Sequence, residues 1–448
     1  MSNQVITFGC RLNAYESEAI KSAVNSSGRE DLIVFNSCAV TSQAEKQLRQ
    51  AIRKAARENP DAKIVVTGCA AQINPTDYAR MEEVSLVIGN EDKSKTKSYS
   101  LDKAKQANQI VHRELGHQDH IFFKENKKEE FFDSALEEKI LVNDIMSVTE
   151  TASHMISGFE NKSRAFVQVQ NGCNHRCTFC IIPYGRGNSR SVALGEIVSQ
   201  IKKLVDNGYK EVVLTGVDIT DYGADLLGGI TFSQMIKRLL KLVPELPRLR
   251  VSSIDVAEAD NDLLDIVENE PRFMPYFHIS LQSGDDMILK RMKRRHDRNQ
   301  VIEFCKKVRE LRPESAFGSD IIVGFPTETE EMFLNTVNLI KEADIVLNHI
   351  FPYSIRKGTP AAKMPQVPPQ IRKERAARLR VETAIQLNQF LDNMIATRQK
   401  VIIEDGNIGR CENFITTKIE SEINLNSGDI VEVLVNQRVD DQLISRII

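Results

Sequence analysis

Three cysteines, Cys173, Cys177 and Cys180, stand at a C-x3-C-x2-C spacing in the segment NGCNHRCTFCIIPYGRG. Thiolates are preferred ligands of iron–sulfur clusters and of zinc. Zinc needs a fourth ligand to complete its tetrahedron, and the nearest candidate, His175, lies inside the loop between two of the thiols. The spacing therefore favours a cubane 4Fe–4S cluster with one iron open to another ligand. A zinc site and inert buried thiols are the alternatives.

This spacing, with Phe179 directly before the third cysteine, resembles the signature of the radical S-adenosylmethionine (SAM) enzymes. In that family the amino and carboxylate groups of SAM chelate the open iron. An electron from the cluster then cleaves SAM to a 5′-deoxyadenosyl radical. The resemblance implies SAM as a cofactor, with Phe179 among the residues that contact it.

Three more cysteines, Cys10, Cys38 and Cys69, each follow a short apolar run that is typical of a strand. Two amphipathic helical stretches separate these runs, so the pattern is βαβαβ and predicts a parallel sheet. The carboxyl ends of parallel strands share one edge, where thiols far apart in sequence can converge. We expect a second cluster with three protein ligands; small residues packing at turns are the alternative. The expected strands are 5–8, 32–35 and 63–67, and the helices 13–26 and 41–58.

Two sets of three cysteines resemble the methylthiotransferase branch of the radical SAM enzymes, over nearly the whole chain. The sequence GCRLN at Cys10 resembles the enzymes that act on N6-threonylcarbamoyladenosine in tRNA. The resemblance implies that the N-terminal auxiliary cluster carries the sulfur, that one SAM methylates it, and that a second SAM supplies the radical. The product is the 2-methylthio derivative of the base next to the anticodon. The implied partners are tRNA, an electron donor and a sulfur source, the last two unidentified.

Three other functions stay open at this point. The same chemistry could act on N6-isopentenyladenosine in tRNA or on an aspartate of a ribosomal protein. A protein of a different class would bind RNA or transfer electrons through iron–sulfur clusters without SAM chemistry.

Alternating strands and helices follow the Cys173 loop and predict about six βα units, too few to close an eight-stranded barrel. The open side would admit a large substrate, and the pattern matches the (βα)6 core of radical SAM enzymes. Polar residues and glycines just past the strands are expected to hold SAM, with ordinary turn chemistry as the alternative. These residues are Thr215, Gly216, Ser253, Gln282 and Gly324. The expected strands are 165–170, 211–215, 249–253, 276–281, 319–323 and 346–350.

The fold class is therefore α/β, with an N-terminal parallel α/β domain, a central incomplete TIM-like (βα)6 barrel and a small C-terminal β-barrel. We place an auxiliary-cluster domain at 1–105, a linker at 106–160, the radical SAM core at 161–397 and the β-barrel at 398–448. In this β-barrel, GRCENF (409–414) together with GDIV (428–431) resembles the TRAM module, which many tRNA-modifying enzymes use to bind RNA. Six Lys/Arg against nine Asp/Glu in it oppose phosphate binding. RNA contact from one local face and a purely structural cap both stay open.

The remaining candidates are weaker. His112, His117 and His120 are expected in a solvated linker, Cys305 in the core, and Cys411 outside both cysteine sets. Two segments are basic: 289–312 has ten Lys/Arg against three acids, and 356–380 has eight against one. A solvated helix face is the alternative for the first, and we favour RNA contact for the second, whose Pro-rich part should be extended.

Bulk composition fits an intracellular enzyme. The net charge is −3, 41% of residues are hydrophobic and 27% are charged, so the chain as a whole has no nucleic-acid footprint. The sequence contains no apolar run near 18 residues and no signal peptide, which predicts a cytoplasmic protein without a membrane span.

Overall fold

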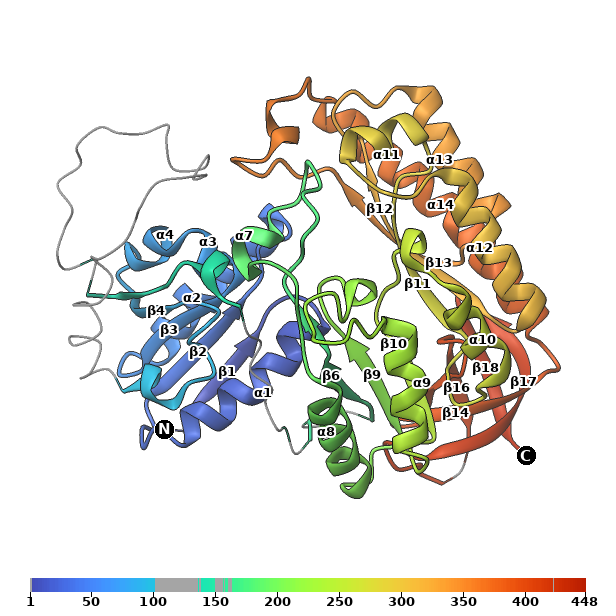
Figure 1. The fold of residues 1–448 in the computed structure, drawn as a ribbon, viewed down its shortest axis with the longest axis horizontal. Helices are drawn as coiled ribbons and strands as arrows, with labels where there is room; N and C mark the ends of the chain where they lie inside the picture. Colours follow the sequence, from blue (N-terminus) through green and yellow to red (C-terminus); the bar gives the residue numbers. More distant parts are fainter. Residues whose placement is uncertain are drawn as a thin grey trace. The chain divides into compact units, whose positions relative to one another are not determined.

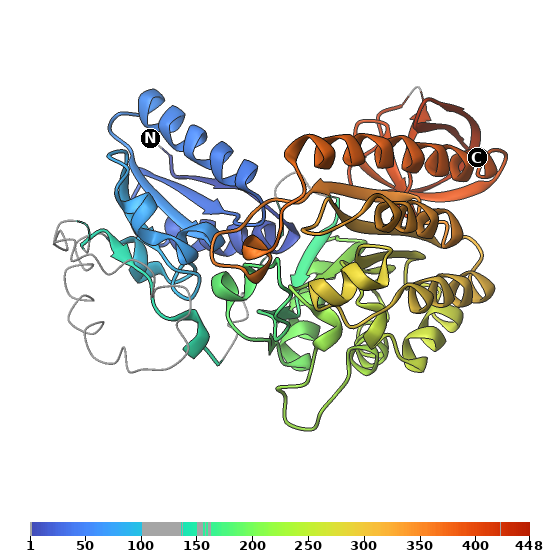
Figure 2. The ribbon, with the colours of Figure 1, turned by 90° about the horizontal axis from the view of Figure 1, so that it is seen from above.

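The computed structural model describes residues 2–100, 136, 138–149, 156, 158–159, 163–421 and 423–448 (Figures 1 and 2). The chain forms two compact units. Unit 1 comprises Met1–Met155, Asn171–Arg190 and Ile355–Ala362, and unit 2 comprises Ile156–Gln170, Ser191–Ser354 and Lys363–Ile448. The loop that carries Cys173, Cys177 and Cys180 thus belongs to the same unit as the N-terminal cysteines. The histidines of the predicted linker lie outside the described residues, and the domain limits stay predictions.

Unit 1 is built on a five-stranded parallel sheet in the order β1-β2-β3-β4-β5 (Figure 1). The first three strands match the prediction, whereas β4 and β5 were not predicted. Thr7, Asn36 and Thr67 pair in one row, so these three strands end at the same level. The strands are β1 (Gln4–Thr7), β2 (Leu32–Ser37), β3 (Lys63–Gly68), β4 (Val84–Ile88) and β5 (Ile140–Leu141), and the helices are α1 (Arg11–Asn25), α2 (Ser42–Glu58), α3 (Cys69–Ile73) and α4 (Pro75–Ala79).

Helices cover both faces of this sheet, which explains why every residue of β2 is buried. On one face Phe35 packs with Leu48 and Ile52 of α2, and on the other Val34 packs with Ile20 of α1. Alternate residues of one strand therefore face different helices. The hydroxyl of Thr41, the first residue of the helix predicted at 41–58, accepts a hydrogen bond from the Ala44 N–H and is the N-cap of α2.

Unit 2 contains six parallel strands in chain order, as predicted for a (βα)6 core. Two three-stranded sheets, β6-β9-β10 and β11-β12-β13, are joined by bridges from Leu249 to Phe273 and from Ile254 to Ile279. In the part of the chain that the structure describes, β6 and β13 do not pair with each other, so the barrel is open. The strands are β6 (Ala165–Gln168), β9 (Glu211–Thr215), β10 (Arg248–Val251), β11 (Tyr276–Gln282), β12 (Ala316–Val323) and β13 (Leu347–Pro352).

Helices alternate with the strands of this core, as the sequence predicted, and one short helix, Asp286–Met292, was not predicted. They are α8 (Leu194–Asp206), α9 (Phe232–Leu242), α10 (Asn261–Asn269), α11 (Asp286–Met292), α12 (Arg298–Leu311) and α13 (Glu330–Glu342). A further helix, α14 (Pro369–Asn393), begins inside the Pro-rich stretch that was expected to be extended, and a 3-10 turn (Pro360–Lys363) precedes it. The prediction of an extended chain was therefore wrong at both ends of the Pro-rich stretch, where the chain is helical. Proline is tolerated in the first turn of a helix.

The C-terminal strands close into a barrel in the order β14-β15-β16-β18-β17, with β14 also pairing with β17. Four of the strands match the apolar runs from which the barrel was predicted, KVIIE, NFITTKI, DIVEVLV and QLISRII, and β15 was missed. Leu391 of α14 and the fully buried Cys411 belong to the barrel's core. The strands are β14 (Arg398–Asp405), β15 (Ile408–Cys411), β16 (Thr416–Glu420), β17 (Ile430–Val439) and β18 (Gln442–Ile447).

This barrel contacts the first residues of the core strands. The Phe414 ring stacks on Tyr276 with centroids 4.5 Å apart, the Arg250 guanidinium donates to the Glu412 carbonyl at 2.8 Å, and Arg164 pairs with Glu404 at 2.5 Å. The barrel therefore caps the amino ends of the core strands, at the end opposite to their carboxyl ends. No helix among the described residues is long and apolar enough to cross a membrane.

Candidate metal centres and cofactor site

The N-terminal thiols lie just past three adjacent strands. Cys10 is the N-cap of α1, Cys38 follows β2, and Cys69 is the first residue of α3. All eight cysteines of the chain are among the described residues, and none of them is in a disulfide. Cys10 is exposed, Cys38 is half-buried and Cys69 is buried. The structure thus brings the three predicted ligands to one edge of the sheet.

Glycines directly before two of these cysteines let the backbones approach each other. Gly9 and Gly68 have φ values of +112° and +94°, which L side chains rarely adopt. A Cβ at Gly9 would lie 2.9 Å from the Cβ of Cys38, and a Cβ at Gly68 would overlap the Ser37 carbonyl oxygen. The Gly-Cys pairs therefore bring Cys10 and Cys69 close to the end of β2, next to Cys38.

Polar side chains that the sequence analysis did not single out fix this edge. The Asn13 amide donates to the carbonyls of Phe8 at 2.8 Å and of Ser37 at 3.0 Å. The Ser37 hydroxyl accepts from the N–H groups of Ala70 and Ala71 at the start of α3. Asn13 is part of the GCRLN segment, and Ser37 directly precedes a cysteine, so their positions beside the thiols were the signal that could have identified them.

The thiol environment tests whether this set fits a metal cluster. Burial, together with the negative charges of Cys69 and Cys10 in their thiolate forms, raises the pKa of the Cys38 thiol to about 11. Three thiolates this close repel one another unless a cation sits between them. Iron supplies such charge and binds the thiolate form, so the donor set fits a cluster.

The second cysteine set lies on a loop that begins at β7 (Gln170–Asn171), contains α7 (Ile182–Arg186) and ends at β8 (Arg190–Ser191). The Cys173 N–H donates to the Gly187 carbonyl at 3.1 Å, and the Cys180 N–H donates to the Cys177 carbonyl at 3.0 Å. The His175 N–H donates to the Cys173 sulfur at 3.3 Å. Backbone hydrogen bonds therefore shape the loop around its three thiols, and a backbone N–H to sulfur contact of this kind stabilises a cluster ligand.

The loop packs against the helix that begins with Cys69, within the same compact unit. Figure 1 shows α7 beside α3, and a Cβ at Gly185 of α7 would lie 3.2 Å from the Cβ of Cys69. The Asn90 amide donates to the Gly185 carbonyl, and its nitrogen lies 4.0 Å from the Cys69 sulfur. Gly185 is five residues beyond Cys180 in the sequence. The structure thus brings the two predicted ligand sets into one region of unit 1.

A buried ion triplet, Arg186–Glu16–Lys93, connects the loop to the N-terminal sheet. Arg186 donates to both carboxylate oxygens of Glu16, at 2.7 and 2.9 Å, and Lys93 lies 2.6 Å from one of them. Burial would raise the pKa of Glu16, but the positive charges of Arg186 and Lys93 outweigh burial and lower it to about 2. The triplet could not be predicted from the sequence, because its members are separated by long stretches of chain.

The residues predicted to bind SAM in unit 2 lie at the carboxyl ends of four consecutive strands, β9 to β12. Thr215 and Gln282 are the last residues of β9 and β11, and Gly216 and Gly324 directly follow β9 and β12. Ser253 is two residues past β10. Gln282 and Gly324 have φ values of +70° and +68°, so the chain turns sharply at both positions.

Packing accounts for the two glycines of this group. A Cβ at Gly324 would overlap the side chain of Arg372, and one at Gly216 would lie 2.7 Å from a methyl group of Ile219. Close packing at turns therefore explains why glycine occupies these two positions. Because both lie at the carboxyl edge of the core strands, SAM binding at this edge stays a prediction. Phe179 belongs to unit 1.

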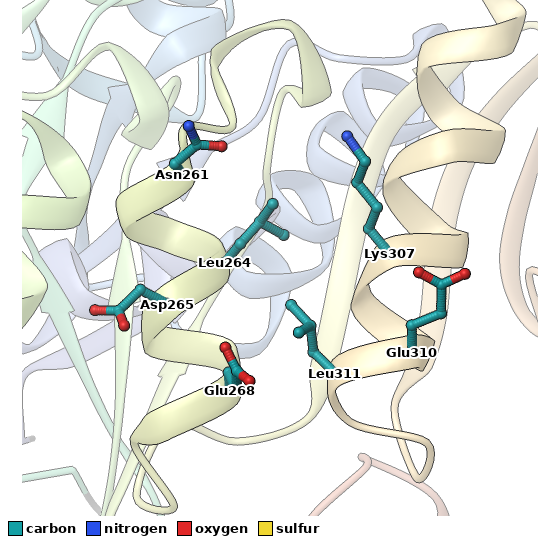
Figure 3. Close-up of a pocket in the computed structure, with 7 residues that line it drawn as sticks. All are labelled: Asn261, Leu264, Asp265, Glu268, Lys307, Glu310 and Leu311. Carbon is teal, nitrogen blue, oxygen red and sulfur yellow. The ribbon is translucent and has the colours of Figure 1, made fainter.

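A separate hollow lies between α10 and α12 (Figure 3). None of the residues predicted to bind iron or SAM lines it. Charged and amide side chains predominate around it, and its lining consists of Asn261, Leu264, Asp265, Glu268, Lys307, Glu310 and Leu311.

Internal contacts occupy many arginines of the two basic segments. Arg294 pairs with Asp255 at 2.9 Å, Arg298 donates to the Asn335 carbonyl at 2.7 Å, and Arg312 donates to the Phe273 carbonyl at 2.5 Å. In the second segment Arg375 pairs with Glu328 at 2.7 Å and Arg378 with Glu330 at 2.7 Å. These arginines therefore hold helices and loops in place. The exposed cations of the second segment include Lys357, Lys363 and Lys373.

Cys305 lies in the core, as predicted, and His278 is held by structural contacts. The His278 ring contacts the Tyr276 hydroxyl at 3.2 Å and the Asp320 carboxylate at 3.3 Å, and Cys305 is fully buried in α12.

Comparison with known proteins places these features in a family. The radical SAM superfamily matches residues 167–340, and the uncharacterized protein family UPF0004 matches residues 3–89. The threonylcarbamoyladenosine tRNA methylthiotransferase MtaB of Rickettsia prowazekii is 55% identical over 94% of this chain and 92% of its own length. MtaB of Aquifex aeolicus is 36% identical over 96% and 98%, respectively.

More distant proteins share the same architecture. The tRNA-2-methylthio-N(6)-dimethylallyladenosine synthase of Clostridium botulinum (strain Langeland) is 32% identical over 91% of this chain and 86% of its own length. The solved structure of the radical SAM methyltransferase TsrM from Kitasatospora setae has a similar fold, with a TM-score of 0.55 and 13% identity over 80% of this chain and 74% of that chain. This chain belongs to the radical SAM methylthiotransferase family, whose members use SAM and two 4Fe–4S clusters.

Proposed function

We propose that this enzyme converts N6-threonylcarbamoyladenosine next to the tRNA anticodon into its 2-methylthio derivative, and that it does so in the cytoplasm. The similarity to MtaB of Rickettsia prowazekii, at 55% identity over 94% of the chain, supports the choice of substrate. The observation that carries the reaction type is that both cysteine sets belong to one compact unit, with α7 packed on α3.

We assign Cys173, Cys177 and Cys180 to the cluster that binds SAM, and Cys10, Cys38 and Cys69 to the auxiliary cluster. When bound, the first cluster would supply the electron that cleaves SAM, and the second would hold the sulfur. Thr215, Gly216, Ser253, Gln282 and Gly324 line the carboxyl edge of the core, where SAM would lie, and Phe179 lies on the cluster loop.

The substrate chemistry explains why the chain needs no general base. The C2–H of adenine is too weak an acid for a carboxylate or histidine to remove, so a radical must abstract the hydrogen atom. The reaction also consumes electrons and a sulfur atom that tRNA cannot supply. An electron donor and a sulfur source are therefore required in addition to tRNA.

Mass spectrometry of tRNA nucleosides from a deletion strain tests the proposal. Loss of 2-methylthio-N6-threonylcarbamoyladenosine would support it, and an unchanged nucleoside profile would reject it. Loss of the 2-methylthio isopentenyl nucleoside instead would assign the enzyme to the other tRNA substrate.

Complementation provides a matched control. Cys305→Ala removes a buried thiol outside both cysteine sets and should restore the nucleoside, whereas Cys38→Ala should not. Restoration by both variants would remove Cys38 from the proposed ligand set.

A further inference from the structure

The Arg186–Glu16–Lys93 triplet is almost completely shielded from solvent. The exposed fractions of the three residues are 3%, 4% and 4%, respectively. Arg186 binds both oxygens of Glu16, and Lys93 binds one of them. Because water cannot screen these charges, the net charge of the triplet has a strong electrostatic effect on neighbouring groups.

The triplet has two cations and one carboxylate, so it carries a surplus positive charge. The other described hydrogen bonds of the two cationic side chains go to neutral amides: Arg186 donates to Asn13 at 2.7 Å and to Asn171 at 3.2 Å, and Lys93 donates to Asn90 at 2.7 Å. A buried uncompensated cation is unfavourable by several kcal/mol. An anion of another kind should therefore lie nearby.

Two of these amides, those of Asn13 and Asn90, lead directly to predicted iron ligands. The Asn13 oxygen that accepts from Arg186 lies 3.6 Å from the Cys10 sulfur, and the Asn90 nitrogen lies 4.0 Å from the Cys69 sulfur. The surplus cation is thus one side chain away from two thiols of the auxiliary set. Three thiolates with a 4Fe–4S core carry net negative charge, which becomes more negative on reduction.

We propose that the surplus positive charge of the Arg186–Glu16–Lys93 triplet stabilises the reduced form of the auxiliary cluster and so sets its reduction potential. This inference rests on the proposed function, because it takes Cys10, Cys38 and Cys69 as the ligands of that cluster. Arg186 reaches the N-terminal sheet from the loop of the other cysteine set. The loop that serves SAM cleavage therefore also tunes the centre that holds sulfur, and Arg186 acts as a positioning residue.

Changing the charge of the triplet in both directions tests the proposal. Glu16→Gln removes the negative charge, which increases the net positive charge of the triplet by one and should raise the midpoint potential. Arg186→Met and Lys93→Met each remove one positive charge and should lower the potential. A unit charge nearby in a protein interior changes the ratio of reduced to oxidised cluster by about tenfold at a fixed solution potential. That corresponds to about 59 mV for a one-electron couple. Arg186→Lys keeps the charge and should restore most of the wild-type potential.

The measurement is a redox titration, followed by electron paramagnetic resonance, of the full-length chain reconstituted with iron and sulfide. A Cys177→Ala background removes the signal of the other cluster. Lys95→Met is the matched control, because Lys95 is two residues from Lys93 but its side chain is 41% exposed, so solvent screens its charge. Its potential should stay unchanged.

Opposite shifts for Glu16→Gln and Arg186→Met would support the proposal, since a merely structural role gives no sign change. Unshifted potentials, or shifts of the same sign, at a normal iron content would overturn this inference alone. If Arg186→Met does not fold, Lys93→Met provides the same test. A Cys177→Ala chain without any cluster would overturn the ligand assignment, and this inference with it.

Discussion

Replacing Glu211 with glutamine would remove the central carboxylate from the junction between the core strands and the C-terminal barrel. Glu211 and Arg250 are both fully buried, and the guanidinium binds the carboxylate through two hydrogen bonds of 3.0 and 3.1 Å. Arg248 and Arg164 approach the same carboxylate at 3.7 and 3.8 Å. One anion thus compensates several guanidinium groups where solvent cannot reach.

Glu211→Gln should lower the free energy of unfolding strongly, because it leaves the buried Arg250 guanidinium without its carboxylate. Its remaining acceptors are neutral: the amide oxygen at position 211 and main-chain carbonyls, including that of Glu412 at 2.8 Å. Breaking a buried ion pair from one side destabilises a protein by about 3–5 kcal/mol. For a domain of more than about 200 residues, this lowers the Tm by roughly 6–10 °C. The double variant Glu211→Gln/Arg250→Met should be less destabilised than Glu211→Gln, because it leaves no unpaired charge at this pair.

Thermal unfolding of the full chain, followed by circular dichroism, measures this difference. Glu342→Gln is the matched control: it makes the same substitution in a pair with Arg298 whose carboxylate side chain is 50% exposed, so the expected loss is below about 1 kcal/mol. If Glu211→Gln lowers the Tm no more than Glu342→Gln does, the buried Glu211–Arg250 pair does not stabilise this junction, which would contradict the prediction.

The pH dependence gives a second check on the same residue. Burial would raise the pKa of Glu211, but Arg250, and then Arg164 and Arg248, outweigh burial and lower it. A carboxyl whose pKa is lower in the folded state stabilises the fold above its unfolded pKa of about 4.3, and this stabilisation disappears as the pH falls through the folded pKa. The stability difference between wild type and Glu211→Gln should therefore be constant above about pH 5 and shrink at more acidic pH.

Three further changes test the cysteine sets and the barrel junction. Cys177→Ala should lower the iron content of the reconstituted chain from about eight to about four atoms and abolish SAM cleavage, whereas Cys305→Ala should change neither. Gly68→Ala should destabilise unit 1 and lower the iron bound by the auxiliary set, because the added Cβ overlaps the Ser37 carbonyl; proteolysis and iron analysis measure both effects. Phe414→Ala removes a ring stacked on Tyr276 and should lower the unfolding free energy by about 2–3 kcal/mol in urea titration.

Each of these expectations has a result that would contradict it. Full iron content in the Cys177→Ala variant would refute the assignment of Cys177 as an iron ligand. Loss of iron in the Cys305→Ala variant would show that a cavity in the core is enough to lower the iron content. Normal iron and protease resistance in Gly68→Ala would mean that the end of β2 can shift to admit a methyl group. An unchanged urea midpoint for Phe414→Ala would mean that the stacked ring does not fasten the barrel.

The local patterns of the sequence determined most of the elements and the candidate ligands. Short apolar runs and helical periodicity are properties of short segments, so Cys10, Cys38 and Cys69 could be placed after strands without knowledge of the fold. The open (βα)6 core follows from the same repeated pattern. Short elements such as β5 and β15 were not predicted, because two to four residues are too few to show a periodic pattern.

Only the tertiary structure decided which charges are satisfied and which segments belong together. A run of arginines reads the same whether it faces water or carbonyl groups, so the internal contacts of Arg298 and Arg312 were invisible in the sequence. Arg186 and Glu16 are 170 positions apart, and nothing in the sequence near either one indicates the other. Burial makes such long-range pairs strong, and burial depends on the packing of the whole unit rather than on any single stretch of chain.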